Sequence, residues 1–136
     1  MAKRVLKDCY VSIDSNLIHG YCSKLALKIE VDEQEVTTFG SLGWKEVLGG
    51  IQSGGLDLDL KQDAAAAALD AIMFPLIGTV VPFEVRISQA SVGTSNPKFT
   101  GNVLIKEWTP ISGGVGDVAE VSVSFPTSGA VTRATS

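Results

Sequence analysis

Apolar and polar residues alternate at every second position along most of this chain, which is typical of β-strands with one buried and one solvated face. The stretch 54–60, Gly-Gly-Leu-Asp-Leu-Asp-Leu, is the clearest example. In an extended strand its three leucines share one face, while Asp57 and Asp59 share the other, roughly 7 Å apart. The pattern therefore predicts a mainly β fold.

The alternation predicts strands over residues 5–13, 24–31, 56–60, 81–90, 99–108 and 118–125. The positions of the second strand that should point inward are Leu25, Leu27, Ile29 and Val31. Those of the last strand are Val121, Val123 and Phe125. Trp108, at the end of an alternating strand, is also expected in the core.

A polar tract, 32–35, and the short segment 36–39 lead into a glycine-rich connection over residues 40–55. The glycines argue against a regular helix, and the apolar residues argue against a free linker. This segment is therefore expected to pack against something. Phe39 and Trp44 could stack on a ligand or contact another chain, and contact is favoured because large exposed apolar groups usually mark interfaces.

The run 63–74 is predicted to be the one helix. Asp63 is a good N-cap, five alanines follow, and Leu69, Ile72 and Met73 recur at helical spacing. Their apolar face should contact the sheet. The polar tail, 127–136, could be a short edge strand or a mobile arm.

Composition indicates one globular domain, since the chain has 136 residues, of which 45% are apolar. Fifteen acidic residues against eleven basic ones give a net charge of −4, the wrong sign for a protein that grips nucleic acid. The basic N-terminus lacks the apolar segment of a signal peptide, and no stretch reaches the roughly 18 apolar residues of a membrane span. A protein that is soluble and intracellular when made is expected.

The paired aspartates are better explained as a solvated strand face than as a site. Asp57 and Asp59 lack the ligand spacing of a calcium loop. Neighbours two positions apart on one strand are also too far apart to share a proton, which requires about 3 Å.

The other candidate groups are Cys9, Cys22 and the single histidine, His19. A tight hairpin around residues 15–16 would place the two cysteines opposite each other, but free thiols are favoured in a reducing cytoplasm. His19, beside a glycine, is expected in a turn, and the glycine-rich stretches 40–43 and 113–117 also fit turns. No catalytic residue, metal or cofactor is predicted.

Five segments in order resemble the tail tube proteins, or major tail proteins, of long-tailed, siphovirus-type bacteriophages. They are VDEQEVTTFGSLGWKEVLGGIQSGGLDLDL, then KQDAAAAALDAI and PFEVRISQ, and finally NPKFTGNVLIKEWTP with GGVGDVAEVSVSFPTSGAVT. The resemblance rests on their order and spacing and covers nearly the whole chain.

The resemblance implies one tail-tube domain over residues 1–136, an antiparallel β-sandwich with one flanking helix. Copies, six per ring in the family, would close into rings whose inner sheets join into a β-barrel. The rings would stack into the hollow tube through which DNA is ejected. The segment 32–55 would contact the adjacent ring. The implied partners are other copies of the chain, a tape measure protein, a tail terminator and baseplate proteins, in a virion assembled from protein made in the host cytoplasm.

The resemblance also assigns two sets of residues, and no enzymatic role. The candidates that would line the lumen are Lys24, Lys28, Glu30, Asp57, Asp59, Asn102, Lys106, Glu120, Ser122 and Ser124. The candidates for contact between rings are Phe39, Trp44, Val47, Leu48 and Ile51. Negative charge on the lumen wall would repel phosphate and keep DNA from sticking.

Two other functions remain open from the residues alone. The first is a monomeric β-sandwich or barrel that binds a small apolar ligand or carbohydrate, with Phe39 and Trp44 at its mouth. The second, which few candidate groups support, is a hydrolase that uses carboxylates.

Overall fold

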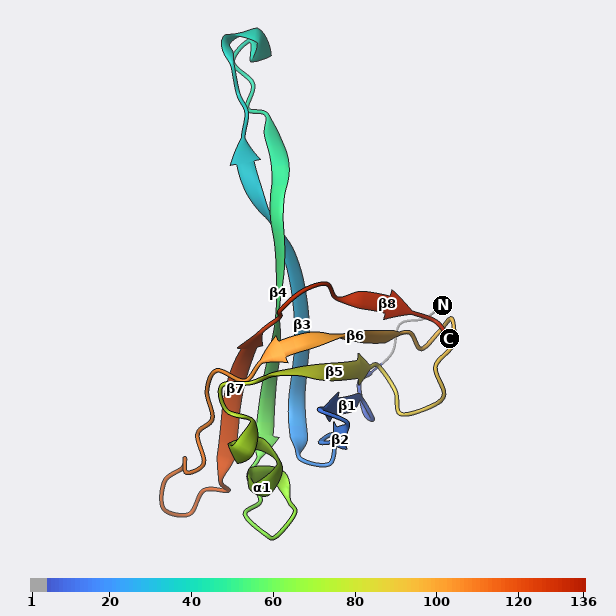
Figure 1. Cartoon of the computed structure of the whole chain (residues 1–136), viewed down its shortest axis with the longest axis vertical. Helices are drawn as coiled ribbons and strands as arrows, with labels where there is room; N and C mark the ends of the chain where they lie inside the picture. Colours follow the sequence, from blue (N-terminus) through green and yellow to red (C-terminus); the bar gives the residue numbers. More distant parts are fainter. Residues whose placement is uncertain (1–4) are drawn as a thin grey trace.

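The computed structural model describes residues 5–136, which form two antiparallel β-sheets and one short α-helix (Figure 1). Residues 1–4, where the predicted domain and its basic N-terminus begin, lie outside the described residues. The elements are β1 (Tyr10–Ile13), β2 (Asn16–Leu17), β3 (Cys22–Glu35), η1 (Phe39–Ser41), β4 (Val47–Lys61), α1 (Leu69–Met73), η2 (Phe74–Leu76), β5 (Val80–Arg86), β6 (Lys98–Leu104), β7 (Glu120–Pro126) and β8 (Thr132–Ala134). One sheet has the strand order β2-β1-β5-β6-β8, and the other has the order β3-β4-β7.

The hydrophobic core combines the apolar faces of both sheets, as the alternation predicts. The buried positions include Leu56, Leu58 and Leu60 of β4, Val121, Val123 and Phe125 of β7, and Val81, Phe83 and Val85 of β5. Each such side chain stabilises the fold by about 2 kcal/mol relative to an exposed position. Trp108 is also buried, as predicted, and its Nε1 donates a hydrogen bond to Oδ1 of Asp70 at 3.0 Å.

The long hairpin formed by β3 and β4 differs from the prediction. β3 continues through the polar tract 32–35, and β4 begins at Val47, so much of the expected glycine-rich loop is a strand. This hairpin projects beyond the rest of the molecule (Figure 1, top). Ile29 and Val31, expected in the core, are about half exposed because they lie where the hairpin leaves the body.

A glycine in β4 is explained by a close chain crossing. A Cβ at Gly54 would lie 2.8 Å from the backbone oxygen of Lys28, so a side chain would require the strands to shift. The carbonyl of Gly54 also accepts hydrogen bonds from the backbone N and the Oγ1 of Thr127, at 3.0 and 3.2 Å. Glycine is needed where three chain segments approach this closely.

The predicted helix over 63–74 is largely wrong, because α1 has only five residues. Ala67 has a left-handed backbone with φ of 62°, and Ala68 is extended, so the alanine run is a turn. Asp63 caps this turn, since its Oδ1 accepts a hydrogen bond from the backbone N of Ala65 at 3.0 Å. Short alanine runs do not hold a helix without packing. Leu69 and Met73, which do pack, are buried as expected.

The remaining strands are shorter than predicted. The first strand begins only at Tyr10, and its hairpin turn consists of Asp14 and Ser15, both with positive φ, as a two-residue type I′ turn requires. The strand expected over 81–90 ends at Arg86, because the buried amide of Asn96 bonds the backbone of the turn that follows. The strand expected over 99–108 ends at Leu104. The tail forms β8 at the edge of the five-stranded sheet, which is the edge-strand alternative.

Candidate assembly surfaces

The three-stranded sheet presents one polar face opposite its buried leucines. Across the strands, Asp59 lies beside Lys24 on one side and Ser122 on the other. Two residues away along β4, Asp57 lies beside Ser124. Side chains that are paired across strands share a face. The predicted lumen residues brought together on this face are Lys24, Lys28, Glu30, Asp57, Asp59, Glu120, Ser122 and Ser124.

Two of the predicted lumen residues lie elsewhere. Asn102 belongs to β6 in the five-stranded sheet, opposite Pro82, and Lys106 follows the end of that strand. Because the predicted lumen set includes residues of both 99–108 and 118–125, it implied that these two strands share one sheet, and this was wrong. The chain between them only borders the three-stranded sheet, where Oε1 of Glu107 accepts a hydrogen bond from the backbone N of Ser124 at 3.3 Å.

The charges on the polar face are mixed and solvated. Nζ of Lys28 lies 3.6 Å from a carboxylate oxygen of Glu30, with both side chains mostly exposed, and Lys61 pairs with Glu120 at the other end of the sheet. Exposed pairs of this kind add little stability. Within residues 5–136 no group of three or more His, Cys, Asp or Glu side chains could hold a metal ion. The polar face is therefore a hydrated surface that carries charges of both signs.

Both outer strands of this sheet have an unpaired edge. β3 and β7 each pair with β4 on one side, and no other strand of the described chain pairs with them along their length. Such edges are templates for pairing with another chain unless they are covered. The sheet can therefore be extended on either side.

The tip of the hairpin, residues 36–46, displays large apolar side chains in an ordered backbone. Trp44 is 79% exposed and Phe39 fully exposed. The tip is held by hydrogen bonds from Ser41 N to Thr38 O (3.0 Å), from Trp44 N to Ser41 O (3.1 Å) and from Val36 N to Glu46 O (2.9 Å). The aromatic residues are thus presented by a structured turn and do not belong to a ligand pocket in the core.

The five residues predicted to contact another ring are all exposed, but the hairpin divides them between its faces. A β-bulge between Val31 and Glu33 shifts the register, so that Leu48 is paired with Gln34 and Val47 with Glu35. Ile51 therefore continues the polar face of the sheet, and beyond the bulge Leu48 does so as well. Val47 lies on the opposite face, the one that Val31 shares. The sequence could not reveal this division, because the bulge depends on strand pairing.

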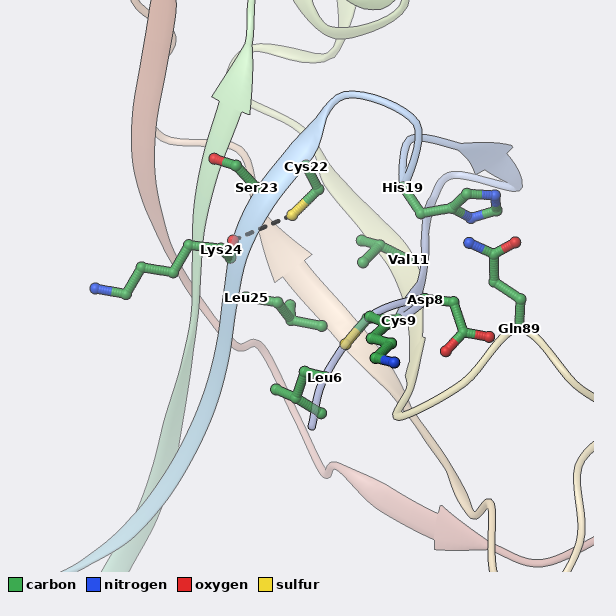
Figure 2. A pocket seen from close by; sticks show the side chains of 11 residues that line it. Leu6, Asp8, Cys9, Val11, His19, Cys22, Ser23, Lys24, Leu25 and Gln89 are labelled. Atoms are coloured by element: carbon green, nitrogen blue, oxygen red, sulfur yellow. Dashed lines mark hydrogen bonds between the residues drawn. The ribbon is translucent and has the colours of Figure 1, made fainter. Parts of the chain in front are cut away.

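Cys9, Cys22 and His19 line a pocket of about 250 Å³ near the start of β3 (Figure 2). Desolvation by burial raises the pKa of both thiols, and neighbouring Asp8 adds to the rise of the Cys9 pKa. The Sγ of Cys22 donates a hydrogen bond to the backbone oxygen of Lys24 at 3.1 Å. Both cysteines are free. Protonated thiols are poor nucleophiles, so this pocket does not have the chemistry of a thiol enzyme.

The sequence interpretation missed two further apolar surfaces. Leu25, Leu27 and Phe99 line a second pocket, of about 380 Å³, beneath the open edge of β3. Ile111 and Val115 are almost fully exposed in the loop before β7. The only sequence signal for the pocket is that its residues are apolar at alternate positions, which is equally typical of a closed core.

In residues 5–136 there is no helix with the length and apolar character needed to cross a membrane.

A family model described as phage tail tube protein matches residues 19–133. Among solved structures, a chain of the "Virion of native gene transfer agent (GTA) particle" is similar with a TM-score of 0.78 and 20% identity, over 96% of this chain and 98% of that chain. A chain of the "Tail of empty GTA particle computed with helical refinement, C6 symmetry" is similar with a TM-score of 0.65 and 19% identity, over 82% and 81% of the two chains. A search of curated proteins finds no match.

Proposed function

This chain belongs to the phage tail tube protein family, and from that premise we propose that it forms hexameric rings that stack into a hollow tube through which DNA leaves the particle. Its role is that of a structural protein of the virion tail, and it is not an enzyme.

The observation that carries the proposal is the three-stranded sheet with one polar face and two open edges. β3 and β7 both run antiparallel to β4, so they run parallel to each other. A rotation about an axis along the strands brings β3 of one copy beside β7 of the next in a parallel pair. Closing the sheets in a ring removes every open edge, as in other barrels. The C6 symmetry of the similar tail supports six copies.

In this arrangement the polar face becomes the wall of the lumen. Its acids, including Asp57 and Asp59, are interspersed with lysines such as Lys24, which keeps the wall wet without making it basic. A purely basic wall would bind phosphates over many rings and slow the passage of DNA, because each neutralised phosphate adds affinity.

The exposed hairpin is proposed to join successive rings. The hairpin exposes large apolar side chains, which is typical of an interaction site. They are Phe39, Trp44, Val47, Leu48 and Ile51. The tape measure, tail terminator and baseplate proteins are the further partners proposed, and the subunit is proposed to be made in the host cytoplasm before it enters the virion.

Electron microscopy of the purified protein tests this function directly. Rings or tubes with six-fold averages are expected, together with a concentration-dependent rise in particle mass by light scattering. A particle that keeps the 14.3 kDa mass of one chain at the highest attainable concentration would refute self-assembly and favour a monomeric binding module.

A further inference from the structure

The pocket beneath the open edge of β3 has the form of a socket for a protein side chain. Leu25, Leu27 and Ile29 of β3 form one wall, and Val85 and Phe99 of the other sheet form the opposite wall. Leu6 closes one end, and the cavity holds about 380 Å³. Apolar cavities of this size are the usual receptors for an aromatic or aliphatic anchor residue.

Among the described residues, Arg86 is the one charged residue that lines this socket, and two further cations lie near its ends. Arg133 is the cross-strand partner of Phe99 and therefore lies on the same face at the edge of β8. Lys7 follows Leu6 at the other end and is exposed. Arg133 is exposed as well, so both cations are accessible to a partner.

The outer hairpin has the complementary chemistry. Residues 32–46 contain four acidic side chains, Asp32, Glu33, Glu35 and Glu46, against the single cation Lys45. Between these acids stand Phe39, Leu42 and Trp44, all largely exposed. The hairpin tip, residues 36–46, is called the knob: its apolar side chains are flanked by acids, whereas the socket is an apolar cavity with cations near its ends.

We propose that the socket binds the hairpin tip of a second copy of this chain, the copy in the adjacent ring. This inference rests on the proposed tube, since it specifies where the hairpin of one ring docks. Knob and socket lie on different parts of the same subunit, so the contact is head-to-tail and repeats without closing, as in a filament. Trp44 and Phe39 supply the buried anchors, and the opposite charges orient the approach.

The geometry also limits the spacing between rings. The socket centres on Leu27 and the tip begins at Phe39, twelve residues further along β3 and its extension. At about 3.3 Å per residue, this separates knob and socket by roughly 40 Å at most. The axial repeat of the tube should therefore be no larger than that distance.

A chemical cross-link tests the docking because the socket contains a native thiol, that of Cys9. The probe is a short bismaleimide, applied to assembled Trp44→Cys protein in a Cys22→Ser background. Each subunit then carries one thiol in the knob and one in the socket, too far apart within a chain to be bridged. We expect a ladder of covalent dimers, trimers and longer chains under denaturing conditions. Leu42→Cys repeats the experiment with Trp44 intact.

Two controls define the outcome. The Cys22→Ser protein without a knob thiol should give no ladder. Val115→Cys in place of the knob thiol tests whether the loop before β7 of a ring neighbour fills the socket instead.

Tubes that form but give no ladder with either knob thiol, or that give a ladder only with Val115→Cys, would overturn the docking and leave the tube function standing. A parent protein that forms no tubes would overturn the proposed function itself, and the docking with it.

Discussion

The two halves of the β3–β4 hairpin both carry apolar side chains but have different surroundings. In the lower half, Leu56 and Leu58 are buried against the five-stranded sheet. In the upper half, Leu48 and Ile51 lie on the continuation of the polar face and are 62% and 77% exposed. Since burial is the main stabilising term in folding, the lower half stabilises the subunit and the upper half is left for assembly. An apolar residue in a strand thus does not by itself identify the partner that covers it.

The largest effect is expected from a core substitution in the lower half of the hairpin. Leu58→Ala should lower the free energy of unfolding by about 2–5 kcal/mol, because it leaves a cavity in the core. The matched change Leu48→Ala in the upper half should stay within about 0.5 kcal/mol in the free subunit. Urea unfolding followed by circular dichroism measures both. Equal losses would mean that the upper half is also part of the subunit core.

The second prediction concerns the contact that the upper half of the hairpin makes between rings. Trp44→Ala combined with Leu48→Ser should leave unfolding unchanged but weaken contact between rings by at least about 2 kcal/mol, roughly thirty-fold in affinity, as for other interface anchors. Tube length by electron microscopy reports the loss. If the double variant forms tubes like the parent, the hairpin is not the contact between rings.

The third prediction concerns the boundary between the halves, where Gly54 meets the crossing chain. Gly54→Ala should destabilise the subunit by about 1–3 kcal/mol, because the new Cβ would meet the oxygen of Lys28 at 2.8 Å. Gly55→Ala is the control, since its Cβ meets no atom closer than 3.9 Å. Thermal unfolding of the two variants compares them, and similar midpoints would show that the crossing tolerates a side chain.

The smallest effect is expected on the polar face of the lower half. Asp57→Asn with Asp59→Asn should change stability by less than about 0.5 kcal/mol, because solvated charges contribute little. Tube assembly should survive, and delivery of DNA should fall modestly in an infection or transfer assay. Loss of a bound divalent metal or of a catalytic activity would instead revive the site that the sequence interpretation set aside.

Sequence patterns predicted the faces of the strands better than their partners. Val121, Val123 and Phe125 are buried as expected, because alternation reflects local geometry. Asn102 was placed in the wrong sheet, since sheet membership depends on pairings between distant segments. The helix failed because the propensity of alanine is weak without packing, and Ala67 adopts a left-handed turn. Which face of the hairpin Leu48 and Val47 each occupy depends on where the bulge lies, and the bulge also depends on strand pairing.

The crossing of Thr127 over Gly54 also has a mechanical consequence. Thr127 bonds Gly54 in the hairpin and bridges to Val103 in the other sheet, so this one point ties the hairpin to both layers. A pull on the tip along the hairpin slides β3 and β4 together past β7. Because antiparallel hydrogen bonds lie perpendicular to the strands, such a pull loads the whole β4–β7 ladder in shear instead of opening it one bond at a time. The subunit is therefore strongest against tension along its own long axis.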